Sequence, residues 1–100
     1  MNLNSFCLLA FSLTVRSQPI KIVAVGDSIT EGAGASDCCS RDAANSWPGQ
    51  LKTMLNDDSK YEILNLGLSG RTMQKNGDVP YWDEDGYQEA LNSEPDILIL

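Results

Sequence analysis

The chain has 100 residues, of which 42% are hydrophobic and 21% are charged, a composition typical of one soluble globular domain at most. Its formal net charge of −7 argues against nucleic acid or an anionic membrane surface as a partner. The sequence contains no histidine, so a serine–histidine enzyme would lack its general base within these residues.

Residues 1–18 differ in character from the rest of the chain. The apolar run over residues 6–15 has the length of a signal-peptide core and is too short to span a bilayer. No positive side chain precedes the run and the cleavage pattern after it is poor, so an apolar arm packed on the domain is the alternative. We predict a signal peptide or apolar leader over residues 1–18, a domain over residues 19–100, and a secreted or endomembrane protein without a stable membrane span. A protein without such a signal would be soluble and cytoplasmic.

The first structured segment is predicted over residues 20–25, a short β-branched run that ends at Gly26 and is typical of a buried parallel strand. Asp27 and Ser28 follow the strand directly. Ligands of open α/β sheets bind outside the carboxyl ends of the strands, where backbone N–H groups converge. Ser28 at this position suits a nucleophile whose attack builds negative charge on a nearby oxygen. The same Asp-Ser pair also fits a plain helix cap.

The cysteines and the small-residue loop after Ser28 indicate no cofactor. Cys7 would leave with the leader, and a bond between the adjacent Cys38 and Cys39 is predicted to be strained. Pairing with cysteines beyond residue 100 and an ordinary unpaired loop both remain open for these two residues, and their spacing offers no metal site. The glycine-containing loop 32–36 lacks the features of nucleotide-binding loops.

A helix and a second strand follow. Asn45 or Ser46 can cap a helix whose first turn holds Pro48. Its apolar residues recur on one face and are expected to be buried: Trp47, Leu51, Met54 and Leu55. The second strand is predicted over residues 61–66, and a strand, a helix and a strand with short connections form a right-handed parallel unit.

Gly67 ends the second strand as Gly26 ends the first. Because parallel neighbours end at the same edge of a sheet, we expect Gly67 and Ser28 to share one pocket. A glycine here would admit a substrate oxygen to its N–H group. A tight turn that needs a positive φ is the structural alternative. Arg71 is the nearest cation, and we expect it to pair with a surface carboxylate rather than to hold a substrate.

The last part of the chain predicts a loop over residues 72–80, a helix over residues 83–92 and a third buried strand over residues 96–100. The predicted fold class is α/β, with a parallel sheet of which these residues form a βαβαβ part.

Two segments resemble the GDSL, or SGNH, family of serine esterases. Residues 26–32, Gly-Asp-Ser-Ile-Thr-Glu-Gly, are similar to the first family signature, and Gly67 within residues 65–70 matches the glycine after the second strand. The resemblance implies a three-layer α/β/α flavodoxin-like fold, Ser28 as nucleophile, Gly67 as an oxyanion donor and no metal or organic cofactor. It implies an acyl or acetyl ester as substrate, either a small molecule or a carbohydrate.

The family's Gly-x-Asn-Asp and Asp-x-x-His motifs do not occur in this sequence. The resemblance therefore implies the first half of such a domain, without its histidine base and inactive alone. Two other functions remain as alternatives. One is a non-catalytic α/β module that binds a small anion or carbohydrate. The other is a flavodoxin-like phosphate binder that uses Ser28 and Thr30, for which no cofactor loop is found.

Overall fold

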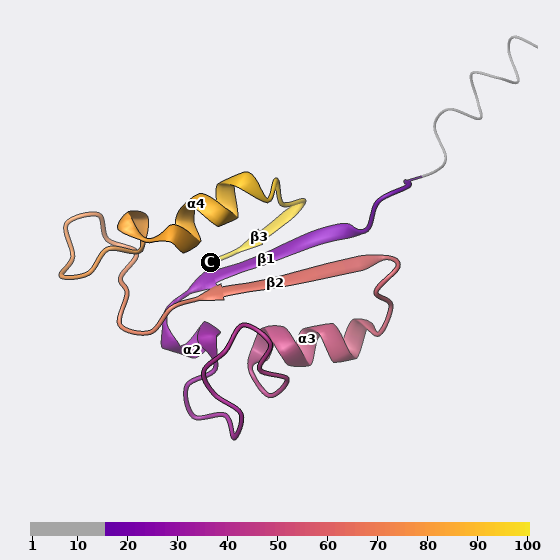
Figure 1. The fold of residues 1–100 in the computed structure, drawn as a ribbon, viewed down its shortest axis with the longest axis horizontal. Coiled ribbons are helices and arrows are strands. Elements are labelled where there is room, and N and C mark those ends of the chain that lie inside the picture. Colours follow the sequence, from indigo (N-terminus) through magenta and orange to yellow (C-terminus); the bar gives the residue numbers. More distant parts are fainter. Residues whose placement is uncertain (1–15) are drawn as a thin grey trace, which may run out of the picture.

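The computed structural model describes residues 16–100, so nearly all of the predicted leader lies outside the described residues. Three parallel strands form one sheet in the order β2-β1-β3 (Figure 1). They are β1 (Ile20–Gly26), β2 (Tyr61–Gly67) and β3 (Ile97–Ile99). This arrangement confirms the predicted parallel α/β architecture, and the register places Gly26 beside Gly67 at one edge of the sheet.

Helices lie on both sides of the sheet. α2 (Ser28–Glu31) and α3 (Trp47–Leu55) lie on one side, and α4 (Asp85–Asn92) lies on the other (Figure 1). This placement follows from the strand order, because the crossover from β1 to β2 and the crossover from β2 to β3 run in opposite directions across the sheet, and right-handed crossovers in opposite directions put their helices on opposite faces. A short 3₁₀ turn, η1 (Tyr81–Asp83), precedes α4.

The core lies between the sheet and α4. Val23 and Tyr81 are completely buried, and Val25, Leu66 and Ala90 pack with them. The Tyr81 hydroxyl donates to the Leu66 carbonyl oxygen at 2.6 Å, so the one polar atom of this side chain is satisfied inside the core.

Predictions of burial are wrong in two elements, α3 and β3. Met54 is 81% exposed. Its helix α3 packs on β2, the edge strand of the sheet, so the side of the helix that carries Met54 faces solvent. In β3, Ile97 and Leu98 are 47% and 49% exposed. No strand or helix among residues 16–100 covers the outer edge of β3, and this explains why its apolar residues are only half-buried.

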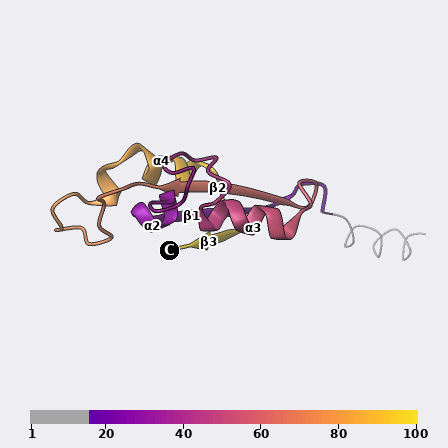
Figure 2. The same cartoon turned by 90° about the horizontal axis from the view of Figure 1, so that it is seen from below.

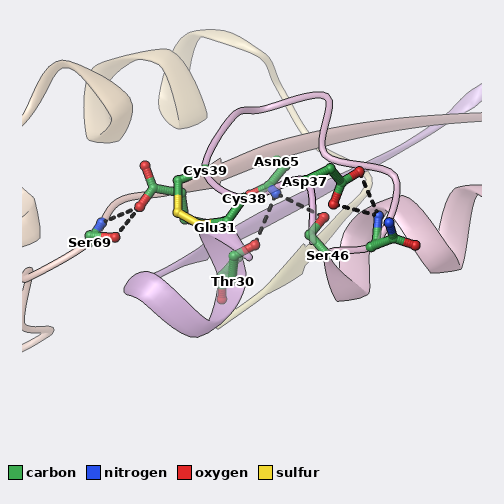
Figure 3. The surroundings of a disulfide bond; sticks show 9 residues. Thr30, Glu31, Asp37, Cys38, Cys39, Ser46, Asn65 and Ser69 are labelled. Atoms are coloured by element: carbon green, nitrogen blue, oxygen red, sulfur yellow. Dashed lines mark hydrogen bonds between the residues drawn. A yellow bond between two sulfur atoms is a disulfide. The ribbon is translucent and has the colours of Figure 1, made fainter. Parts of the chain in front are cut away.

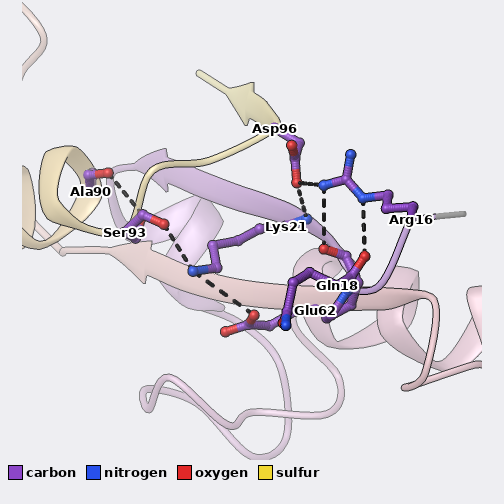
Figure 4. A network of polar contacts seen from close by, with 8 residues as sticks. Arg16, Gln18, Lys21, Glu62, Ala90, Ser93 and Asp96 are labelled. Atoms are coloured by element: carbon purple, nitrogen blue, oxygen red, sulfur yellow. Dashed lines mark hydrogen bonds and ion pairs between the residues drawn. The ribbon is translucent and has the colours of Figure 1, made fainter. Parts of the chain in front are cut away.

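A polar network fixes the beginning of β3 to β1 (Figure 4). The Asp96 carboxylate accepts from the Lys21 backbone N–H at 2.8 Å and pairs with Arg16, while the Lys21 ammonium donates to the Ser93 carbonyl at 2.8 Å. The hydrogen bond from Arg16 contributes most to lowering the pKa of Asp96 below its usual range, and the hydrogen bond from the Lys21 N–H contributes next. These contacts lie at the amino ends of the strands, opposite the end that carries Ser28. In the part of the chain that the structure describes, no helix has the length and apolar character to cross a bilayer.

Candidate functional site

Ser28 is the first residue of α2 and lies immediately beyond the carboxyl end of β1. Asp27 caps the helix, because its carboxylate accepts from the Ile29 N–H at 3.0 Å. The N–H of a first helical residue has no carbonyl four residues earlier in the helix to bond. Among residues 16–100, neither the Ser28 N–H nor its hydroxyl has a hydrogen-bond partner. The cap and the candidate nucleophile are therefore compatible, because they use neighbouring residues.

The short helix that carries Ser28 is held at both ends. Gly32 ends it with a φ of 108°, in the left-handed region that favours glycine, and donates its N–H to the Ser28 carbonyl at 2.9 Å. Thr30 is buried against Gly26, where an added Cβ would collide with the threonine side chain. A four-residue helix has little stability of its own, so these tertiary contacts fix the position of Ser28.

Asn65 links this helix to the second strand. Its side chain is 4% exposed, and its amide nitrogen donates to the Thr30 carbonyl at 2.9 Å. Its amide oxygen accepts from the Gly67 N–H at 2.9 Å. Figure 3 shows Asn65 between Thr30 and Ser46, the N-cap residue of α3. One buried side chain therefore joins the two strand ends predicted to share a pocket.

Gly67 lies at the predicted edge, but its N–H group is already occupied. Successive N–H groups of a strand point to opposite sides. The Leu68 N–H donates to the Gly26 carbonyl of β1, and the Gly67 N–H faces away from β1, toward Asn65. A Cβ on Gly67 would meet the backbone of Thr30 and Glu31. The need for glycine therefore comes from close packing with α2, and the alternative of a positive φ is wrong because this φ lies outside the left-handed region.

The loop after Gly67 contains a second glycine that sequence reasoning did not select. Gly70 is exposed and has a φ of 76°, and no atom lies within 4 Å of a Cβ built on it. Within residues 16–100 its N–H has no hydrogen-bond partner. The sequence signal for such a position is a glycine among polar loop residues, which marks a backbone site with positive φ.

Side-chain contacts fix the loop around Ser69. The Glu31 carboxylate accepts from the Ser69 N–H at 2.9 Å and also from its hydroxyl (Figure 3). Arg71 donates from Nη1 to the Ser69 carbonyl at 2.8 Å and from Nε to the Glu84 carboxylate at 2.9 Å. The expected pairing of Arg71 with a carboxylate is confirmed, although the two side chains are only 30% and 26% exposed.

A polar hollow of 340 Å³ lies beside the end of β2. The chain segments that line it are the end of α2, the loop around residue 40, the end of β2 and the start of α4. The loop between α2 and α3 reaches this hollow by rising toward α4 (Figure 2), where Arg41 pairs with Glu89 at 2.6 Å. This ion pair lowers the pKa of Glu89, chiefly through the Arg41 hydrogen bond, and raises the pKa of Arg41. Ser28 is not one of the residues that line the hollow.

Cys38 and Cys39 lie in the same loop and form a disulfide with each other (Figure 3). The expectation against such a bond is wrong for this structure. No cluster of three metal-ligating side chains occurs among the described residues.

The fold and site define a parallel α/β protein with an unengaged serine at the carboxyl end of the central strand. Comparison with known families gives the specific assignment. Residues 24–100 match the GDSL-like Lipase/Acylhydrolase family, and the chain belongs to this family, as the resemblance of residues 26–32 predicted.

The chain is also similar to a protein named acetylxylan esterase from Xylanibacter ruminicola. The two are 34% identical over 85 residues, which cover 85% of this chain and 16% of the relative. The chain therefore spans a small part of the length of the relative that it matches. No solved structure matches it.

Proposed function

We propose that the protein containing this chain hydrolyses esters with Ser28 as the nucleophile. The observation that carries the proposal is the position of Ser28 at the end of β1, with no hydrogen bond to its N–H or hydroxyl within residues 16–100. The Ser28 oxygen attacks the acyl carbonyl carbon and its proton goes to a general base. The alcohol then leaves as the acyl-enzyme forms, and water releases the acid in a second attack. Because these 100 residues contain no histidine, we assign the base to a residue outside them.

Two backbone N–H groups are proposed to hold the developing oxyanion. Ser28 supplies one of them, and the loop after β2 supplies the other. Gly67 is the donor that the family resemblance predicted, but its N–H would first have to leave Asn65. The N–H of Gly70 needs no such exchange, and the absence of neighbouring atoms leaves room for a substrate. These contacts support Gly70 over Gly67 as the second donor.

We propose an acetylated carbohydrate as the substrate and assign no cofactor. The support comes from the relative named acetylxylan esterase. Chemistry of this kind needs only an activated serine, hydrogen-bond donors for the oxyanion and a base, so no organic cofactor is required.

We further propose that residues 19–100 form the N-terminal part of an esterase domain behind a cleaved leader, in a secreted protein. The half-exposed apolar residues of β3 support this proposal, since a further strand or helix would cover them. The 100 residues alone are then expected to be inactive, because Ser28 without a base is a weak nucleophile near neutral pH.

The test is the substitution Ser28→Ala in the protein expressed to the natural stop codon of its reading frame. Hydrolysis of p-nitrophenyl acetate should fall by about 10⁴-fold or more, as in other serine hydrolases that lose their nucleophile. Ser59→Ala is the matched control, because Ser59 lies in the exposed loop before β2 at the opposite end of the sheet. Equal hydrolysis by Ser28→Ala and the wild type would exclude Ser28 as the nucleophile.

A second candidate function is a non-catalytic module that binds a carbohydrate or small anion at the same strand ends, where the N–H groups of Ser28 and Gly70 have no hydrogen-bond partner within residues 16–100. Under that function the wild-type protein would bind acetylated xylo-oligosaccharides in calorimetry without any Ser28-dependent hydrolysis. Measurement of turnover and binding on one preparation separates the two.

A further inference from the structure

We propose that Arg71 is a positioning residue that fixes the peptide between Ser69 and Gly70, and with it the direction of the Gly70 N–H. This inference rests on the proposed function, in which Gly70 donates to the oxyanion. Arg71 itself is not assigned any contact with the substrate.

The first step concerns Ser69, whose backbone is held on both sides. Its N–H donates to the Glu31 carboxylate at 2.9 Å, and its hydroxyl bonds the same carboxylate. Its carbonyl oxygen accepts from Arg71 Nη1 at 2.8 Å. Glu31 therefore holds the peptide before Ser69, and Arg71 holds the peptide after it.

The second step concerns peptide geometry. The Ser69–Gly70 bond is trans, so the Ser69 C=O and the Gly70 N–H lie in one plane and point in opposite directions. A hydrogen bond that fixes the carbonyl therefore also fixes the N–H. Gly70 has no side chain, a φ of 76° and open space around its Cα. Among residues 16–100 no other hydrogen bond orients this peptide, so its direction depends on Arg71.

The third step concerns how Arg71 is itself oriented. Its Nε donates to Glu84, the residue that precedes α4, while Nη1 reaches the Ser69 carbonyl. A guanidinium can make both bonds because its donors are fixed in one plane. A lysine would keep the positive charge, but its single ammonium on a flexible stem cannot hold both partners in the same geometry. Arg71→Lys therefore removes the orientation and keeps the charge.

The chain offers a matched control in Arg16. Like Arg71, it bonds a backbone carbonyl two residues away and pairs with a carboxylate. Arg16 Nε donates to the Gln18 carbonyl at 3.0 Å, and its guanidinium pairs with Asp96 (Figure 4). It lies at the amino ends of the strands, far from Ser28. Arg16→Lys removes the same kinds of bond without touching the loop after β2.

The experiment measures steady-state hydrolysis of p-nitrophenyl acetate by the protein expressed to its natural stop codon with residues 1–18 left uncleaved, so that Arg16 is present in every variant. Arg71→Lys should lower kcat by about 10- to 100-fold, the effect expected of a small misplacement of a catalytic group, and leave KM within about twofold. Arg16→Lys should leave kcat unchanged. A purely structural role for Arg71 would lower the melting temperature of Arg71→Lys without lowering its kcat.

A second measurement reports on the peptide directly. The ¹⁵N order parameter of the Gly70 amide should fall in Arg71→Lys and stay at its wild-type value in Arg16→Lys. If Arg71→Lys does not fold, Glu84→Gln is the substitute, because it leaves the arginine in place and weakens only its anchor. The same two measurements then apply, with a smaller loss of kcat expected.

The possible failures are distinguishable. Ser28-dependent hydrolysis in the wild type with an unchanged kcat in Arg71→Lys would overturn the positioning role and leave the proposed function standing. An unchanged Gly70 order parameter would also overturn it. If the wild type shows no Ser28-dependent hydrolysis, the proposed function fails, and the positioning role fails with it.

Discussion

Asn65 is the side chain on which the geometry of the candidate site depends most, and the substitution Asn65→Ala tests this. The alanine variant loses two hydrogen bonds of 2.9 Å, one to the Thr30 carbonyl and one from the Gly67 N–H. A buried hydrogen bond contributes about 1 kcal/mol net, and a buried partner left without a bond costs about 1–3 kcal/mol. Because the site is buried, water cannot easily replace the amide. We expect the free energy of unfolding to fall by about 2–4 kcal/mol.

The assay is urea denaturation followed by tryptophan fluorescence, with Asn92→Ala as the control. Asn92 is exposed at the end of α4, and its substitution should change the stability by less than about 0.5 kcal/mol. Asn65→Asp should be at least as destabilising, because a carboxylate can accept from Gly67 but is buried and faces the Thr30 carbonyl oxygen, to which it cannot donate. A loss below about 0.5 kcal/mol in Asn65→Ala would refute the argument that this side chain holds α2 on β2.

Two further predictions follow from the site and from the amino end of the sheet. Replacing the N–H of Gly70 by an ester oxygen through semisynthesis should lower kcat by about 10²- to 10³-fold. The same change at Gly67 should mainly lower stability. The reverse pattern would make Gly67 the oxyanion donor. Because the folded-state pKa of Asp96 is lowered, its contribution to stability is present above its unfolded pKa and is lost as pH falls through the folded pKa. Acid titrations of melting temperature should therefore show a smaller drop in Asp96→Asn than in the wild type, and identical curves would contradict this assignment.

The strands and the position of Ser28 could be predicted because their signals are local. Residues 20–25 and 61–66 are short, mostly apolar runs, each ended by a glycine, and the structure extends each strand only to that glycine. In a parallel pair joined by one helix, the carboxyl ends of the two strands lie at the same edge of the sheet, so this prediction needs no information on side-chain contacts. The family signature at residues 26–32 depends on the same local order of residues.

The contacts that orient the site could not be predicted, because they join residues distant in the sequence. Gly67 must be glycine because α2 packs on it, and α2 is too short to show an apolar period in the sequence. The bond from Asn65 to Thr30 spans 35 residues, and the bond from Ser69 to Glu31 spans 38. Tyr81 was missed because it follows an irregular loop, although it is completely buried.

The two sides of the candidate site are held by interactions of different kinds. The Ser28 side depends on α2, which is fixed by the buried Thr30 and by the 4% exposed Asn65, where salt has little access. The Gly70 side depends on the Arg71–Glu84 ion pair, whose side chains are 30% and 26% exposed and therefore partly screened by salt. A nucleophile must be held closely, whereas an oxyanion donor in a loop has to admit substrate before it bonds the oxygen. The placement of the rigid contacts at Ser28 and the weaker ionic contacts at the loop therefore matches the different demands of the two proposed roles.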